Sequence, residues 1–325
     1  MTPLKRAKLA SELFTRFEGN PILTADDWPY PINSVFNPGA VRVNGEVLLL
    51  NRVEDMRGFS HFCVSRSKNG LTDWQIDEAP TMEADQQSHE ERWGLEDPRI
   101  VWLEEQKQYG ITYVSFGMGG PVVSLAITRN FKTFARLGGM IPPEDKDACL
   151  FPRRFHGRFA LIHRPVVRGE AHIWMSLSPD LKHWGDHRVL LGTRYAHWDG
   201  ARIGLGCQPI EIPEGWLIVY HGVRRTTASQ IYRTGLALLD KNEPWRVLRR
   251  SEEWVLGPRE DYERIGDVSD VTFVTGGVVM PETNQLLLYY GAADDKVAVA
   301  MADLDKVREY IMMCPEPPEQ DSRHA

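Results

Sequence analysis

The sequence is poor in cysteine. Only four cysteines are scattered through its 325 residues, and no two of them form a CxxC pair. A zinc site usually needs closely spaced ligand pairs, and a disulfide framework needs a higher density, so the sequence predicts neither. Free thiols in a reducing compartment are the expected state, which favours a cytoplasmic protein. The four positions are Cys63, Cys149, Cys207 and Cys314.

Long apolar runs are also missing. No stretch is long enough to span a bilayer, so we expect no membrane partner. The first residues, "MTPLKRAKLASELFTRFEG", contain basic side chains but no apolar core followed by a cleavage site. They predict a short amphipathic helix within residues 1–19 rather than a signal peptide. Such a helix packs either on its own domain or on a second copy, so a homo-oligomer is one expectation.

An excess of positive charge is absent as well. The chain has 38 basic and 45 acidic residues, a formal net charge of -7. This balance argues against a general binder of nucleic acid or of anionic membranes, although it allows a local basic pocket.

What is present is a repeated pattern of short strands. "AVRVNGEVLLLNRV" (Ala40–Val53) predicts two strands around an Asn-Gly turn. Four later segments follow the same plan: "PRIVWLEEQKQYGITYVSF", "LFPRRFHGRFALIHRP", "CQPIEIPEGWLIVYHGV" and "GGVVMPETNQLLLYYGA". A third strand and a polar turn that ends on an aromatic residue follow each of the first four pairs. These aromatic residues, at intervals of 60, 50 and 61, are Trp74, Phe134, Trp184 and Trp245.

Repeated units of about four strands are typical of propeller blades. We therefore predict an all-β protein, a five-bladed β-propeller, with its blades between Asn37 and about Val307. A β-sandwich is the alternative, but it does not explain the recurring aromatic residues. The predicted domains are an N-terminal helix (1–19), the propeller (20–307) and a C-terminal extension (308–325), with a short helix at "LDKVREYIMM".

Propellers carry their sites where the inner strands of all blades meet. Polar residues recur at such places in this sequence. Asn37, Asp97 and Lys146 or Asp147 open the first three units, and three later strands end on polar residues: His163-Arg164, His221 and Asp294.

One of these residues is a candidate catalytic acid. Asp97 lies in "HEERWGLEDPRIVW" and is followed by Pro98, so a strand-entry cap is the simpler interpretation. Its place in the repeat and the nearby Trp93 favour function, because an aromatic wall raises the pKa of a carboxyl group and keeps it protonated.

The acidic neighbours of Asp97 have other expected roles. We expect Glu96 and Arg99 to form a supporting ion pair, and Glu90 and Glu91 to be solvated.

A second group of candidates is basic. An arginine at a strand end is usually a surface ion-pair partner. Lys146, Arg164, His221 and Tyr232, however, come from two further units and would form a cationic, hydrogen-bonding cluster. The glycine-rich "GLGCQP" (Gly204–Pro209) precedes no predicted helix and is interpreted as a turn. No histidine or cysteine spacing predicts a metal site.

The chain resembles the glycoside phosphorylases of glycoside hydrolase family 130, which act on β-mannosides. The matching stretches run from about Asn20 to Ala300. They are "NPILTADDWPYPINSVFNPGAV", "NRVEDMRGFS", "GLEDPRI", "PPEDKDACLFP", "HRP", "IWMSLSPDLKHWG", "GWLIVYHGV", "YRTGLALLD", "GPREDYERIGDV" and "YYGAADDKVAVA". The resemblance implies a five-bladed propeller, in agreement with the repeat.

The resemblance also implies roles for individual residues. Asp97 matches the proton donor. Asn37, Arg52 and Asp294 match residues that hold the mannosyl unit to be transferred. The phosphate-binding positions are Lys146, Arg164, His221 and Tyr232. Two segments depart from the family pattern, "DVSDVTFVTGG" and "GLGCQP", and both are expected on the acceptor side of the site.

These residue types predict phosphorolysis. An inverting hydrolase needs an acid and a base, whereas phosphate is already a nucleophile and needs cations to hold it. We expect inverting cleavage to α-mannose 1-phosphate and a shortened sugar, and the resemblance implies that the proton passes through a mannose hydroxyl. No cofactor or metal is expected, only inorganic phosphate as co-substrate. A β-mannosidase that uses water and a non-enzymatic sugar-binding propeller remain the alternatives.

Overall fold

The computed structural model describes residues 13–227 and 229–317. Strands dominate these residues, and the two α-helices among them are short. The prediction of an all-β protein is confirmed. No helix in the described ranges is long and apolar enough to cross a membrane.

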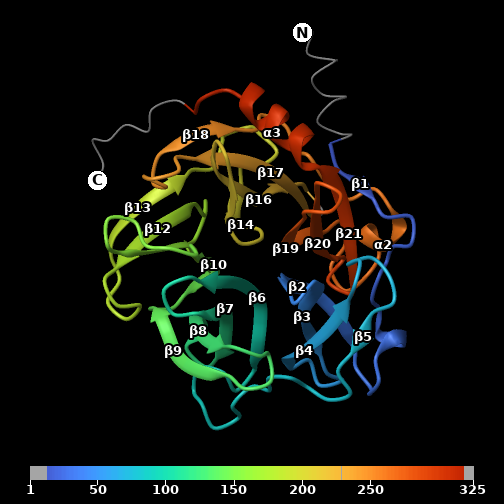
Figure 1. Cartoon of the computed structure of the whole chain (residues 1–325). Helices are drawn as coiled ribbons and strands as arrows, with labels where there is room; N and C mark the ends of the chain where they lie inside the picture. Colours follow the sequence, from blue (N-terminus) through green and yellow to red (C-terminus); the bar gives the residue numbers. More distant parts are fainter. Residues whose placement is uncertain (1–12, 228, 318–325) are drawn as a thin grey trace.

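The strands form five antiparallel groups that follow one another along the chain (Figure 1). The first group contains β2 (Ser34–Val43), β3 (Glu46–Glu54), β4 (Ser60–Ser67) and β5 (Gln75–Ile76). The second contains β6 (Gly94–Leu103), β7 (Gln108–Gly117), β8 (Gly120–Thr128) and β9 (Ala135–Ile141). A single parallel bridge between Ser60 and Gly94 joins these two groups into one sheet.

The remaining groups repeat this order. The third contains β10 (Asp145–Leu150), β11 (Phe159–Pro165), β12 (Ile173–Ser178) and β13 (Gly185–Leu191). The fourth contains β14 (Arg202–Leu205), β15 (Ile210–Ile212), β16 (Gly215–Arg225), β17 (Gln230–Leu239) and β18 (Val247–Arg250). The fifth contains β19 (Thr272–Met280), β20 (Gln285–Ala292), β21 (Lys296–Asp303) and β1 (Thr15–Arg16).

The five groups surround a common centre in Figure 1, and the first strand of each lies nearest to it. Strand β2 contacts β6, β6 contacts β10, and β10 contacts β14. Strand β19 of the last group contacts β2 of the first. The ends of the first strands are therefore brought together although they are far apart in sequence.

Local sequence explains the hairpins. Asn44 and Gly45 both have positive φ, 51° and 86°, in the tight turn between β2 and β3. Asn and Gly adopt this conformation most easily, so the predicted Asn-Gly hairpin is confirmed.

The recurring aromatic residues occupy equivalent places, as predicted. Trp74, Phe134 and Trp184 stand directly before β5, β9 and β13, and Trp245 stands two residues before β18. In the turn that leads to each of the first three, a Ser or Thr hydroxyl accepts a backbone N–H three residues later. All four aromatic side chains are partly buried against the core.

The N-terminal segment corrects one prediction. Most of the expected helix in residues 1–19 lies outside the described residues, but Thr15 and Arg16 form β1, paired with Met301 and Ala300 of β21. An unpaired strand edge offers free backbone N–H and C=O groups to a further strand. Thr15 and Arg16 therefore form the fourth strand of the fifth group, where a helix was predicted.

Short helices connect or follow the strands. They are the 3₁₀ turn η1 (Ala25–Asp27), α2 (Asp261–Arg264) and α3 (Leu304–Met313). Helix α3 coincides with the predicted "LDKVREYIMM" and is capped by Asp303, which accepts the Lys306 N–H at 3.1 Å. It buries Val307 and Ile311, so the boundary predicted at residue 307 falls inside this helix.

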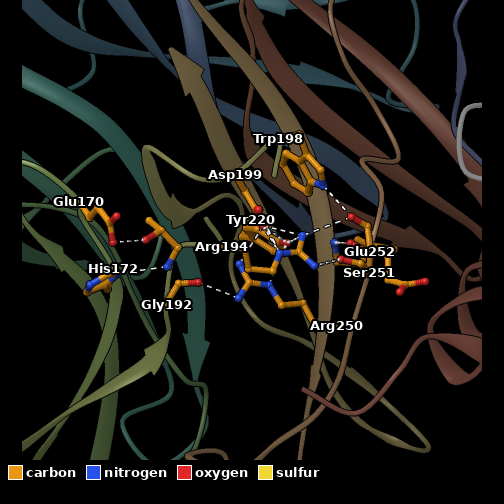
Figure 2. Close-up of polar contacts among 12 residues, drawn as sticks. Glu170, His172, Gly192, Arg194, Trp198, Asp199, Tyr220, Arg250, Ser251 and Glu252 are labelled. Atoms are coloured by element: carbon orange, nitrogen blue, oxygen red, sulfur yellow. Dashed lines mark hydrogen bonds and ion pairs between the residues drawn. The ribbon is translucent and has the colours of Figure 1, made fainter. Parts of the chain in front are cut away.

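A buried ion cluster fixes the connection between the third and fourth groups (Figure 2). The fully buried Asp199 carboxylate accepts from Arg194 at 2.7 Å, Arg250 at 2.8 Å and the Tyr220 hydroxyl at 3.0 Å. Trp198 stacks on Tyr220 with ring centroids 5.7 Å apart. Strand β16, which carries His221 directly after Tyr220, is therefore held firmly against this connection.

Candidate active site

Three of the inner strands have a β-bulge at the same place. The register shifts between Phe36 and Gly39 in β2, between Glu96 and Arg99 in β6, and between Lys146 and Cys149 in β10. The bulged residue in each strand has positive φ: 46° at Asn37, 50° at Asp97 and 51° at Asp147. Asn and Asp are the non-glycine residues that tolerate this region best, and bulges re-aim side chains.

Asp97 lies at the centre of the first cluster. Its Oδ1 accepts hydrogen bonds from Asn37 Nδ2 at 2.9 Å and from Arg52 Nη1 at 3.1 Å. Burial raises the pKa of this carboxyl group, but Arg52, Arg99 and Lys146 outweigh burial and lower the pKa below its ordinary value. Without ligands, Asp97 is therefore held as a carboxylate.

This result corrects the role predicted for Trp93. Its side chain is 40% exposed and packs edge-on against Phe116, with ring centroids 5.4 Å apart. Cations, two of them from other strands and Arg99 from the same strand, set the direction of the pKa shift at Asp97 in place of an aromatic wall.

Glu96 has different partners from the one predicted. Its Oε1 accepts from Arg52 Nη2 and its Oε2 from Lys146 Nζ, each at 3.1 Å. Arg99 instead donates to the carbonyl oxygens of Leu205 and Gly206 at 2.9 and 2.5 Å, because its buried side chain points toward the fourth group.

The prediction for Glu91 was also wrong. This side chain is buried and accepts from the Tyr113 hydroxyl at 2.8 Å, with Arg136 at 3.3 Å, whereas Glu90 is exposed as expected.

Asp294 approaches the first cluster from the turn between β20 and β21. Burial raises the pKa of its carboxyl group to about 6, and the charges of Asp97, Asp267 and Glu96 add to the rise while Arg52 opposes it. Two carboxyl groups of this cluster thus have pKa values shifted in opposite directions.

The predicted basic residues form a second cluster. Lys146 and Arg164 are directly paired between β10 and β11. Arg164 Nε donates to Asp147 Oδ2 at 2.5 Å, and His221 Nε2 lies 3.5 Å from the same oxygen. Tyr232 is the neighbour of His221, with ring centroids 6.0 Å apart. Lys146 also bonds Glu96, so the two clusters are continuous.

The charge of this cluster comes from fewer groups than expected. Burial lowers the pKa of His221 to about 3, despite the opposing charge of Asp147, so the imidazole is neutral. The positive charges among the four residues are those of Lys146 and Arg164, while His221 and Tyr232 supply neutral hydrogen-bonding groups.

Two further residues belong to this cluster. Asp147, which the repeat offered only as an alternative to Lys146, holds both Arg164 and His221. Arg202 at the start of β14 was missed; it donates to the Tyr232 hydroxyl, and to Gln230 Oε1 at 2.6 Å. A cation at the first position of an inner strand was the signal that could have identified it.

The "GLGCQP" segment is not simply a turn, because Gly204 lies in β14, paired with His221. A Cβ atom at Gly204 would lie 2.1 Å from Asp147 Oδ2 and 2.4 Å from His221 Cε1. The missing side chain is what allows these two residues to meet. This segment therefore contacts the basic cluster.

No group of three or more His, Cys, Asp or Glu side chains in the described part of the chain has an arrangement that could hold a metal ion.

Comparison with known proteins shows the family of this chain. A family model described as beta-1,4-mannooligosaccharide phosphorylase matches residues 11–312. The chain belongs to this family, glycoside hydrolase family 130.

Characterised relatives cover nearly the whole chain. A beta-1,4-mannooligosaccharide phosphorylase of Ruminococcus albus is 34% identical over 310 residues, 92% of this chain and 91% of the relative. A beta-1,2-mannobiose phosphorylase of Listeria innocua is 32% identical in an alignment that covers 87% of this chain and 94% of the relative. A solved beta-1,2-mannobiose phosphorylase from Listeria innocua, in complex with beta-1,2-mannobiose, superposes with a TM-score of 0.83. It is 30% identical and covers 92% of this chain and 99% of its own.

Proposed function

We propose that the protein is an inverting phosphorylase that cleaves β-mannosides with inorganic phosphate. The products are α-mannose 1-phosphate and a shortened sugar, and the reaction can also run in the direction of synthesis. The observation that carries the proposal is the continuous arrangement of an acidic and a basic cluster, joined by the Lys146–Glu96 ion pair. Relatives that cleave β-1,4- and β-1,2-linked mannosides support the substrate class.

The proposed scaffold is a five-bladed β-propeller in which each antiparallel group is one blade. The contact of β19 with β2 brings the last group to the first, and β1 adds a strand from the N-terminal segment to the last group. Three bulges at equivalent positions support an arrangement of repeated units around one central axis.

Each predicted residue has a role in this reaction. Asn37, Arg52 and Asp294 hold the mannosyl unit through its hydroxyl groups, while Asp97 supplies the proton for the departing oxygen through a mannose hydroxyl. Phosphate lies against Lys146, Arg164, His221 and Tyr232 and attacks the anomeric carbon from the opposite face. Because the protein holds both reactants in line, a bimolecular step becomes an effectively unimolecular one.

The low pKa of Asp97 gives phosphate a second role. Lys146 is one of the cations that keep Asp97 ionised in the free protein. A bound phosphate anion near Lys146 compensates that positive charge, so the pKa of Asp97 rises when phosphate is present. This rise favours the protonated form of the acid in the complex that is ready to react.

Phosphate itself replaces the base of a hydrolase. An inverting hydrolase needs a second carboxylate that activates water. Asp147 is the carboxylate nearest the basic cluster, but Arg164 and His221 both lie against its Oδ2. In this proposal it orients those two groups rather than activating water.

The decisive experiment is incubation with β-1,4- and β-1,2-linked mannobiose, with and without phosphate, followed by product analysis. We expect α-mannose 1-phosphate only when phosphate is present. Equal rates without phosphate, with release of free mannose, would contradict the proposal and favour a β-mannosidase. The absence of any cleavage, together with binding of the sugar, would favour a sugar-binding propeller.

A further inference from the structure

A chain of polar side chains crosses the third group from its outer strand to its inner strand. His187 Nδ1 on β13 lies 2.6 Å from Ser176 Oγ on β12. The same oxygen lies 2.7 Å from His163 Nε2 on β11, and His163 Nδ1 lies 2.6 Å from Asp145 Oδ2 on β10. Every strand of the group contributes one residue to this chain.

Asp145, His163 and Ser176 have the contacts of a nucleophilic triad, but no substrate can reach them. Their exposed fractions are 1%, 3% and 0%. A nucleophilic serine must meet its substrate, so this arrangement cannot act as one. Its function has to be exerted through the residues that it holds in place.

The inner end of the chain holds the backbone of Arg164. Asp145 Oδ1 accepts the Arg164 backbone N–H at 3.0 Å, while its Oδ2 contacts His163. Asp145 directly precedes Lys146, and His163 directly precedes Arg164. A single carboxylate therefore ties together the two strands at the point where both proposed phosphate-binding cations emerge.

The regular backbone pairing ends directly after this point. Lys146 and Arg164 are paired across β10 and β11, but the register shifts between Lys146 and Cys149. A bulge interrupts the ladder of backbone hydrogen bonds, so side-chain bonds can add to the definition of the spacing of the strands there. Buried hydrogen-bond networks supply this kind of rigidity when all members are satisfied.

We infer that Asp145 and His163 are positioning residues for the phosphate site, acting through Lys146 and Arg164. This inference rests on the proposed phosphorolysis. It assigns a role to a buried Asp-His pair that touches neither the sugar nor phosphate. Loss of the pair loosens Arg164 relative to Lys146 and weakens the binding of phosphate, while the mannosyl site around Asp97 stays intact.

The test compares Asp145→Ala with Asp145→Asn. Alanine removes both contacts, and we expect the phosphate KM to rise about tenfold, with the KM for the mannoside and kcat within about twofold. Asparagine keeps an oxygen that can accept the Arg164 N–H, so it should restore most of the phosphate affinity. Tyr289→Phe is the matched control, because it also removes a buried hydrogen bond, at 2.8 Å to the Gly70 carbonyl oxygen, away from both clusters.

A phosphate KM for Asp145→Ala that is unchanged, or that changes in parallel with the mannoside KM as in the control, would overturn the inference. If Asp145→Ala does not fold, Ser176→Ala decides the matter, since it breaks the same chain while conserving packing. The expected rise in its phosphate KM is about threefold, and no rise would again overturn the inference.

Amide hydrogen exchange separates this inference from the proposed function. Removal of Asp145 should speed exchange in the peptide that contains Arg164, and Tyr289→Phe should not. Cleavage by the wild type without phosphate would contradict the proposed function. The exchange rate of the peptide that contains Arg164 would still show whether Asp145 holds the Arg164 backbone N–H. Unchanged exchange in Asp145→Ala would defeat the positioning role even if the enzyme is a phosphorylase.

Discussion

Asn37 and Asp97 occupy the same bulge position on neighbouring inner strands, and the Asn37 amide donates to Asp97 Oδ1 at 2.9 Å. Both residues have a left-handed backbone, with φ of 46° and 50°. Gly291 leaves room for the Asn37 amide, because a Cβ at Gly291 would lie 1.9 Å from Asn37 Oδ1. The repeated backbone feature therefore delivers an amide and a carboxylate to one point.

Asp97→Asn should remove turnover while leaving the fold intact. Asparagine is nearly isosteric and can accept from Asn37 and Arg52, but it cannot supply a proton to the leaving group. General acid catalysis contributes roughly 10²–10⁴-fold, so kcat on an unactivated mannoside should fall by that factor. A mannoside with an activated leaving group should lose much less, and thermal unfolding serves as the fold control. Wild-type rates on the unactivated substrate would remove Asp97 from the mechanism.

Arg164→Ala should raise the phosphate KM by about tenfold or more. A charged hydrogen bond to a phosphate oxygen is worth roughly 1.5–3 kcal/mol. The KM for the mannoside should change less, because Asn37, Arg52 and Asp97 keep their contacts. Tyr232→Phe loses one neutral hydroxyl and should have a smaller effect. Initial-rate kinetics with both substrates varied measure this difference, and the opposite ranking would contradict the predicted phosphate site.

Gly204→Ala should weaken phosphate binding and destabilise the protein. The new methyl group would overlap Asp147 Oδ2 and the His221 ring, and overpacking of this kind typically costs about 1–3 kcal/mol. Gly185→Ala, in β13 of the neighbouring group, is the control because nothing lies within 4 Å of a Cβ there. Melting temperatures and phosphate KM values should change for the first variant only. Identical behaviour of the two variants would show that the close approach at Gly204 is unimportant.

Asp294→Asn should change how stability depends on pH. Burial raises the pKa of Asp294 from 3.8 to about 6 in the folded protein. The folded state therefore binds more protons than the unfolded state between pH about 4 and 6, and the wild type loses stability as the pH rises through this window. A difference of one pKa unit corresponds to about 1.36 kcal/mol, so the free energy of unfolding should fall by about 2–3 kcal/mol across this window. The asparagine variant should lack this loss.

Denaturant unfolding of both proteins from pH 4 to pH 7 measures this effect. The difference in the free energy of unfolding between wild type and variant isolates Asp294 from the other titrating groups. Curves that run parallel across the window would show that the carboxyl group of Asp294 is not destabilised by burial.

Much of this protein could be predicted from short stretches of its sequence. Alternating apolar residues and the Asn44-Gly45 turn specify hairpins through local conformational preferences. The regular return of Trp74, Phe134 and Trp184 marks equivalent turns. The position of Asp97 within the repeat identified it as a residue of the centre, since equivalent positions of equivalent units face the same way.

The tertiary structure decided which charges meet. The direction of the pKa shift at Asp97 depends on Arg99 of its own strand and on Arg52 and Lys146, which arrive from two other strands. Its sequence neighbour Trp93 lies partly in solvent. Glu96 likewise pairs with the two cations from other strands and not with Arg99, three residues away. Electrostatic effects follow distance in space and burial, and neither is encoded in the local spacing of residues. Backbone preferences of single residues thus determined the strands, while packing between strands far apart in sequence determined the chemistry of the site.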